Sequence, residues 1–181
     1  MVNNLDSKNY SDYSDKLIIA DASPLIELHR LGKVDYLDRL FKNIYTTESV
    51  KKECKFDLPD WIKIEEPRDD TKRIFRKLGF EKGELSAVAL AHEKNIKHDD
   101  NSCVILDDKF AKELIKRNKL NIKNIGLLRV FNFAYQQKIF EKEYIGQLVN
   151  EMEKHHFYIP KNAADIIYGK KYDMGRKGVK R

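Results

Sequence analysis

Cysteine is scarce in this chain of 181 residues, and long apolar runs are missing. The two cysteines, Cys54 and Cys103, lie far apart, and such a pair makes neither a disulfide framework nor a zinc site. We expect both to be reduced, partly buried thiols. No apolar run approaches the roughly 20 residues that a membrane-spanning helix needs. These absences exclude a disulfide-stapled scaffold and a helical membrane protein.

The N-terminal segment also lacks an apolar stretch. Residues 1–16 are polar and contain no apolar core of the kind that a secretory signal requires. We therefore expect residues 1–15 to form a flexible leader on a cytoplasmic protein. Hydrophobic residues make up 41% and charged residues 35% of the chain, which is typical of a soluble globular protein. The length fits one domain, which we expect over residues 16–168.

Positive charge is concentrated at the C-terminus, where we expect a basic tail over residues 169–181. Lys170 to Arg181 contain six Lys or Arg and one Asp, so this segment carries +5 of the net charge of +6. A tail of this kind can act as a nucleic-acid arm, because cations near phosphates release counterions. It can equally be a solvated chain end. The sequence leaves both interpretations open.

Short apolar runs alternate with segments of helical spacing along most of the chain. The runs predict strands at Leu17–Ala20, Asn43–Thr46, Trp61–Ile64, Cys103–Leu106 and Leu120–Ile122. Helical spacing predicts helices at Pro24–Leu31, Val34–Phe41, Glu48–Lys55, Asp69–Leu78, Gly83–Ala91 and Lys109–Lys116, with a polar loop over residues 95–101. From Gly126 onward the pattern is helical and ends in a short helix, Asn162–Tyr168. Strands separated by helices predict an α/β domain whose mainly parallel sheet is covered on both faces.

Two of the predicted buried strands end in aspartate. Asp21 follows the first, and Asp107 and Asp108 follow the fourth. In a parallel sheet the carboxyl ends of the strands open on one edge, which is where α/β proteins bind their ligands. We therefore expect these acids to converge there. A structural alternative exists for each, since an aspartate often caps a turn or a helix with its side chain.

Two glutamates are candidates to join these aspartates. Glu84 stands in the first turn of an alanine-rich helix and Glu53 one turn into its own helix, although the first could simply answer the helix dipole and the second could face solvent. Several carboxylates in one cleft would repel one another and raise at least one pKa. Such oxygen-only clusters bind Mg²⁺ or Mn²⁺, and two such ions can clamp a phosphodiester during hydrolysis. The carboxylates thus suggest metal-assisted hydrolysis of a nucleic-acid backbone.

Four short motifs in this order resemble the PIN-domain nucleases. They are Ile19-Ala20-Asp21-Ala22-Ser23-Pro24-Leu25-Ile26, Val50-Lys51-Lys52-Glu53-Cys54, Gly83-Glu84-Leu85-Ser86-Ala87 and Ile105-Leu106-Asp107-Asp108-Lys109. The chain is most similar to a prokaryotic branch that begins with Asp-x-Ser-Pro-Leu-Ile and continues into a Gly-x-Leu helix, here Gly126-Leu127-Leu128. The resemblance covers roughly residues 16–167.

The resemblance implies a three-layer α/β/α domain with a central parallel sheet and a C-terminal helical extension. It also implies a metal-dependent endoribonuclease that uses Mg²⁺ or Mn²⁺. By motif match, Asp21, Glu53, Glu84 and Asp108 would hold the metal, Asp107 would be a substitute or an addition, and Ser23 would hydrogen-bond within the site. Many relatives are toxins of toxin–antitoxin pairs, inhibited by a small protein encoded beside them, and many form homodimers.

Three other functions were weighed against this one. A catalytically inactive PIN-like module that binds RNA or protein is the main alternative. An aspartate-nucleophile phosphatase is disfavoured because no second carboxylate stands two residues after Asp21. A dinucleotide-binding protein is disfavoured because no glycine-rich loop follows the first strand.

Overall fold

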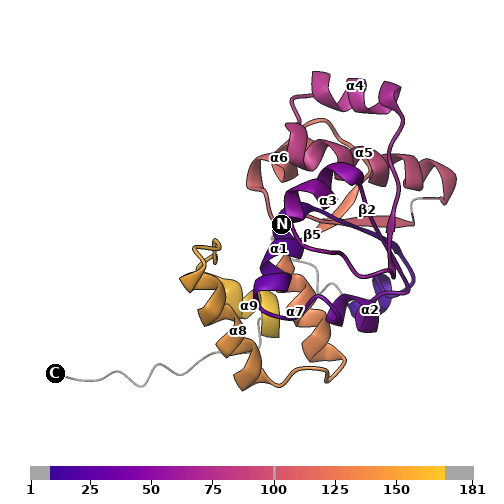
Figure 1. The fold of residues 1–181 in the computed structure, drawn as a ribbon. Helices are drawn as coiled ribbons and strands as arrows, with labels where there is room; N and C mark the ends of the chain where they lie inside the picture. The colour runs from indigo at the N-terminus through magenta and orange to yellow at the C-terminus, as the bar shows by residue number, and fades with distance from the viewer. Residues whose placement is uncertain (1–8, 100, 170–181) are drawn as a thin grey trace.

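The computed structural model describes residues 9–99 and 101–169, and its centre is a parallel sheet of five strands (Figure 1). The strands are β1 (Leu17–Ala20), β2 (Asn43–Thr46), β3 (Ile62–Ile64), β4 (Ser102–Ile105) and β5 (Lys123–Ile125). Their order across the sheet is β3-β2-β1-β4-β5, and every neighbouring pair is parallel. The predicted parallel sheet is confirmed.

Helices cover both faces of this sheet, which gives three layers. In chain order they are α1 (Ala22–Arg30), α2 (Tyr36–Leu40), α3 (Glu48–Cys54), α4 (Asp69–Lys77), α5 (Lys82–Lys97), α6 (Lys109–Arg117), α7 (Leu127–Gln136), α8 (Lys142–Lys154) and α9 (Ala163–Tyr168). In Figure 1, α4, α5 and α6 lie on one side of the sheet and α2, α7, α8 and α9 on the other. The predicted three-layer α/β/α fold with a helical C-terminal part is therefore confirmed.

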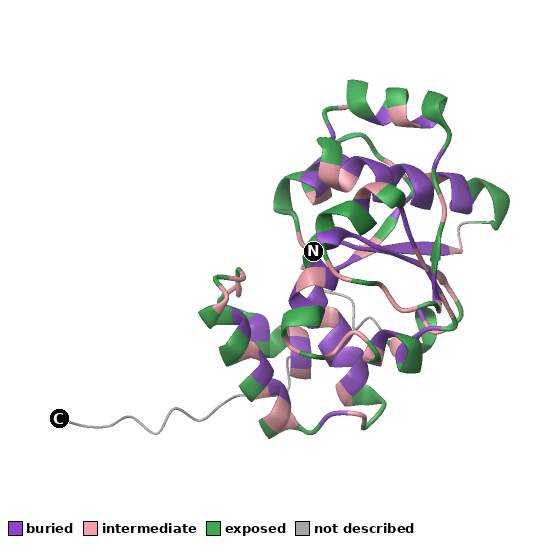
Figure 2. Cartoon of the chain, viewed as in Figure 1, coloured by how far each residue is buried: buried purple, intermediate pink, exposed green. Residues whose placement is uncertain are grey.

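Strands β1 and β4 are buried, apart from the half-buried Leu17 at the start of β1. Ile18, Ile19 and Ala20 of β1 are 0% exposed, and the same holds for Cys103–Leu106 at β4. A strand that is covered on both faces reads as a continuous apolar run, and this is why both strands could be located from the sequence. Figure 2 shows this buried centre beneath helices whose outer faces are exposed.

The strand order creates a switch point beside β1. The chain leaves β1 for β2 on one side, and after β3 it crosses to β4 on the other side of β1. The carboxyl ends of β1 and β4 border this point, and the Asp21 backbone N–H donates to the carbonyl oxygen of Ile105 at 3.1 Å. A parallel α/β sheet binds its ligands in the crevice at such a point.

Two predicted boundaries on the far half of the sheet were wrong. Helix α5 continues to Lys97, through residues 95–97 of the predicted loop. It does so because the Asn95 amide is buried and satisfied, accepting from the Ser102 N–H at 2.8 Å and donating to the Asn121 carbonyl at 2.7 Å. The last strand is Lys123–Ile125 rather than Leu120–Ile122, because its pairing with β4 begins at Lys123.

Helical spacing predicts that Ile74 and Phe110 face the core, but both side chains are exposed. Ile74 of α4 is 57% exposed and Phe110 of α6 is 51% exposed. On α4, Phe75 fills the inward position, at 1% exposure. Short charged helices of this kind bury only a narrow stripe, so spacing alone does not decide which neighbouring apolar residue faces the core.

The N-terminal segment packs on the core from residue 9 onward. A short 3₁₀ helix, η1 (Tyr10–Asp12), brings the Tyr10 hydroxyl to 2.7 Å from the Leu40 carbonyl oxygen. Tyr13 is 5% exposed, and its ring centroid lies 5.1 Å from that of Phe133. Residues 9–15, which we had assigned to a flexible leader, thus have a defined place.

The remaining parts of the predicted termini, residues 1–8 and the basic tail from residue 170, lie outside the described residues. Within the described part of the chain, no helix is both long enough and apolar enough to cross a membrane.

A partly buried hydrogen bond between Glu27 and His155 ties the end of α8 to α1. The carboxylate of Glu27 is 2% exposed, and its Oε1 lies 2.8 Å from Nδ1 of His155 just after α8. Arg30 approaches the other carboxylate oxygen at 3.7 Å. No local pattern in the sequence indicates the contact between Glu27 and His155, because the two residues lie 128 positions apart.

Candidate functional site

Asp21 lies at the switch point, between the end of β1 and the start of α1. It occupies the N-cap position of α1, but its side chain makes no capping hydrogen bond. The residue is 5% exposed, and Oδ1 is buried without a hydrogen-bond partner in the described structure. The helix was predicted to begin at Pro24; it begins two residues earlier, at Ala22, directly at the sheet edge. Asp21 is therefore a buried carboxylate with an unused oxygen.

Burial and neighbouring acids raise the pKa of Asp21 to about 7. Loss of solvent is the largest cause, and a hydrogen bond from the Ala22 backbone opposes it. The negative charges of Glu53, Glu84 and Asp107 raise the pKa further. Three other predicted site residues are thus near enough to repel the Asp21 carboxylate.

Glu53 and Glu84 come from helices α3 and α5, which meet at this edge. The Glu53 carboxylate oxygens lie 3.6 and 3.8 Å from the position that a Cβ on Gly83 would occupy, so this exposed side chain lies against the first turn of α5. Glu84 is half-buried in the same turn, where its Oε1 accepts a hydrogen bond from the Glu81 N–H at 3.1 Å. Both glutamate carboxylates therefore lie near Asp21 at the carboxyl edge of the sheet.

Buried hydroxyl groups hold α3 and α5 in this arrangement. Thr47 caps α3, and its Oγ1 lies 2.8 Å from the Oγ of Ser86 in α5. The neighbouring Thr46 hydroxyl donates to the Ala20 carbonyl oxygen at 2.9 Å, at the end of β1. The two helices that carry the glutamates are therefore fixed to each other and to the strand that precedes Asp21.

Asp107 points toward the start of α7. The Leu127 backbone N–H donates to both carboxylate oxygens at 3.1 Å, and the Lys112 ammonium lies 3.8 Å from Oδ1. Gly126 permits this approach, because a Cβ there would lie 2.5 Å from Oδ1 of Asp107. Burial raises the pKa of Asp107, while Lys112 and the Leu127 N–H act in the opposite direction. Asp107 is thus an oriented, partly neutralised carboxylate.

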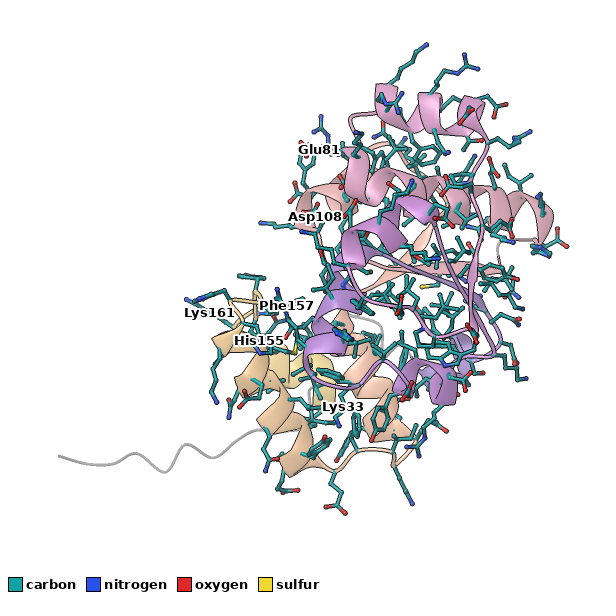
Figure 3. All side chains as sticks on the ribbon, in the orientation of Figure 1. Lys33, Glu81, Asp108, His155, Phe157 and Lys161 are labelled. Carbon is teal, nitrogen blue, oxygen red and sulfur yellow. The ribbon has the colours of Figure 1, made fainter. Side chains whose placement is uncertain are left out.

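Asp108 and Ser23 lie at the outside of this group. Asp108 is exposed and caps α6, accepting a hydrogen bond from the Ala111 N–H at 2.6 Å. Figure 3 shows Asp108 and Glu81 on the same flank of the molecule. Ser23 is exposed in the first turn of α1, and its hydroxyl makes no hydrogen bond within the described residues.

Two residues near the acids were not predicted to belong to the site. Cys54, which is 6% exposed, has its thiol pKa raised to about 11 by burial and then by Asp21 and Glu53, so the thiol stays neutral. Its position directly after Glu53 was the only signal in the sequence. Lys112 reaches Asp107 rather than its helical neighbour Asp108, and spacing alone could not distinguish the two.

The donor set fits a hard divalent cation. The groups around Asp21 offer carboxylate oxygens, and Oδ1 of Asp21 is left without a partner. No three His, Cys, Asp or Glu side chains in residues 9–99 and 101–169 are close enough to enclose an ion. Mg²⁺ does not need such a cage, since it keeps several water ligands and binds through one or two carboxylates together with substrate phosphates. The acids therefore suit an open magnesium or manganese site.

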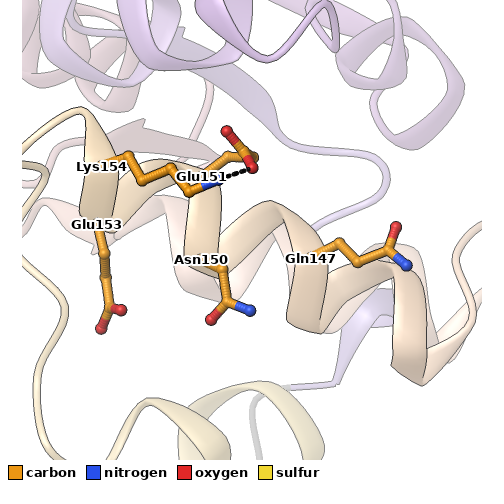
Figure 4. Close-up of a pocket in the computed structure, with 5 residues that line it drawn as sticks. All are labelled: Gln147, Asn150, Glu151, Glu153 and Lys154. Carbon is orange, nitrogen blue, oxygen red and sulfur yellow. Dashed lines mark hydrogen bonds and ion pairs between the residues drawn. The ribbon is translucent and has the colours of Figure 1, made fainter.

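A surface hollow elsewhere in the molecule does not belong to this group. It lies along one helix, α8, and has a volume of about 570 Å³ (Figure 4). Its lining consists of Gln147, Asn150, Glu151, Glu153 and Lys154. None of the predicted site acids lines it.

Comparison with known proteins agrees with the fold. A family model described as a PIN domain matches residues 17–170, which run from β1 to just past α9. No curated protein and no solved structure matches the chain significantly. The PIN domain is a nuclease-type fold, and carboxylates at the carboxyl edge of its sheet are what such chemistry needs. This chain, with its parallel sheet and its acids gathered beside β1, belongs to the PIN-domain family.

Proposed function

We propose that this protein is a metal-dependent endoribonuclease that hydrolyses RNA phosphodiester bonds at the acids around Asp21. One observation carries the proposal: Asp21 is buried at the switch point with an unused oxygen and is repelled by three other carboxylates. A buried charge without a partner is costly unless a cation or a proton neutralises it. A divalent cation is the neutralising group that also serves phosphodiester hydrolysis.

Asp21 and Asp107 are the carboxylates that we assign to the ion. We assign Glu53 and Glu84 to its water ligands, because no three acids in the described residues are close enough to enclose an ion. Mg²⁺ or Mn²⁺ bound there would stabilise the charge that develops on the phosphate and would ease deprotonation of the attacking water. We assign Asp108 to capping α6 instead, because it is exposed and already bonded to the Ala111 N–H. Ser23 could reach substrate from the first turn of α1, since its hydroxyl is exposed.

The chain itself contributes orientation. The Leu127 N–H and Lys112 hold the Asp107 carboxylate in one direction, so it needs no reordering when a cation arrives. The Thr47–Ser86 hydrogen bond does the same for the helices that carry Glu53 and Glu84. Groups that are positioned in advance stabilise a transition state without a reorganisation cost.

Cleavage of single-stranded RNA tests the proposal. We expect wild-type protein to cut RNA with Mg²⁺ or Mn²⁺ and not with a chelator, and we expect D21N to be inactive under all conditions. I96A, which changes an exposed side chain at the far end of α5, serves as the control for handling and folding. If wild-type protein shows no metal-dependent cutting, the chain is a non-catalytic PIN-like binding module. If D21N cuts as well as wild type, the cutting does not depend on Asp21 and the proposed site is wrong.

A role as the toxin of a toxin–antitoxin pair is the biological setting that we propose. Resemblance to toxin-type relatives supports this role. The same resemblance leads us to propose a small antitoxin as partner and a homodimer as the assembly. Co-expression with a small protein encoded beside this gene should suppress RNA cleavage and restore growth. Growth that is unaffected by the nuclease alone would instead favour general RNA processing.

A further inference from the structure

Phe110 is a large aromatic side chain that the core does not use. It lies in the first turn of α6 and is 51% exposed. The inward face of this helix is filled by Ala111, Leu114 and Ile115. The Phe110 ring makes no contact with another aromatic ring in the described part of the chain. Packing therefore does not explain why a phenylalanine stands here.

The outer face of the same helix is cationic. Lys109, Lys116 and Arg117 are exposed, and the Lys112 side chain is 33% exposed. One acidic residue, Glu113, shares the helix, so α6 carries four cations against one anion. A surface of this charge is complementary to a polyanion such as a nucleic-acid backbone.

Phe110 also lies beside the candidate metal centre. Helix α6 begins directly after Asp108, so its first turn stands at the carboxyl edge of the sheet (Figure 1). At a rise of 1.5 Å per residue, the basic residues at the end of α6 lie about 10 Å further along the helix axis. Figure 2 colours much of α6 as exposed.

We propose that α6 is a binding track for single-stranded RNA, with one base stacked on Phe110 and backbone phosphates on Lys109 and Lys116. The identity of the nucleic acid rests on the proposed function. An unpaired strand fits best, because its bases are free to stack on an aromatic side chain while cations follow the backbone. A protein partner fits less well, since one exposed ring among four cations offers little apolar area.

The test measures binding in the presence of a chelator, so that cleavage cannot occur and the result is independent of nuclease activity. By fluorescence anisotropy we expect F110A to bind single-stranded RNA about 5- to 150-fold more weakly, the range that loss of one stacked base produces. F110W should retain binding. I96A is the matched control, because Ile96 is 68% exposed at the opposite end of α5 and its loss should leave binding unchanged.

An abasic scan identifies the stacked base. We expect a single abasic nucleotide, moved along the oligonucleotide, to weaken wild-type binding at one position. F110A should bind the oligonucleotide that is abasic at this position as tightly as it binds the intact one. K109A should lower the dependence of log K on log salt by about 0.7, the value for one phosphate on a single strand. The proposal is overturned if F110A binds single-stranded RNA like wild type, or if F110A weakens binding to duplex RNA as much as binding to single-stranded RNA. It is also overturned if F110A abolishes self-association of the protein while RNA binding persists.

Discussion

Replacing Asp21 by asparagine should make the metal-free protein more stable at alkaline pH. The pKa of Asp21 is raised from its ordinary value of 3.8 to about 7 in the folded protein. Between these values the folded state holds a proton that the unfolded state has released, so stability falls as pH rises. The stability of the wild-type protein is therefore undiminished by Asp21 below about pH 4, and the full loss of stability is reached above about pH 7. Asparagine does not titrate, so D21N should not show this loss.

The size of the effect follows from the same two values. Each pKa unit corresponds to about 1.4 kcal/mol, so the raised pKa costs the wild-type protein on the order of 4 kcal/mol at high pH. At low pH both side chains are neutral and nearly equal in shape, so the two proteins should be similar. At high pH D21N should be more stable by up to about 4 kcal/mol, reduced by the cost of burying an amide.

Urea unfolding across this pH range in a chelator provides the assay. The difference in unfolding free energy between D21N and wild type isolates Asp21, because all other groups are shared. D108N is the matched control: it removes a carboxylate that is exposed and caps a helix, a role that asparagine also fills, and it should not gain stability at high pH. A difference between D21N and wild type that does not change with pH would refute the reasoning.

Three further predictions concern the metal, the core and the tail. Excess Mg²⁺ should raise the melting temperature of wild type far more than that of D21N, since a ligand at a hundredfold excess over Kd adds about 2.7 kcal/mol; equal shifts would argue against a metal site. H155A should lose about 1–3 kcal/mol in urea unfolding, because it removes a partner of the buried Glu27 carboxylate, whereas K154A removes an exposed pair and should change little. Deleting Lys170–Arg181 should weaken RNA binding mainly at low salt, and an unchanged salt slope would assign the tail no role in binding.

The sequence located the central strands and the first acid because local signals were strong there. The apolar run before Asp21 is buried on both faces, and the aspartate follows it directly, so position along the chain determines position in space. The same reasoning could not choose between Asp107 and Asp108. The direction of the Asp107 side chain depends on its contacts with Gly126 and Leu127 at the start of α7, about 20 residues further along the sequence.

Long-range pairing explains the other differences. Asn95 reads as a loop residue, yet its buried amide is satisfied by Ser102 and Asn121 and the helix continues past it. The contact between Glu27 and His155 likewise depends on the tertiary fold. Phe110 was predicted to face inward on spacing alone and is exposed, a departure that fits the role in RNA binding that we propose.

Cleavage of a labelled single-stranded RNA by wild type, D107N and D108N, with Mg²⁺ and with a chelator, tests the central claim most directly. The claim is that Asp21 and Asp107, and not the helix cap Asp108, hold the ion of a metal-dependent nuclease site. We predict that wild type and D108N cut the RNA with Mg²⁺ and that D107N does not. Cutting by D107N at the wild-type rate, loss of cutting in D108N alone, or cutting that persists in the chelator would contradict it.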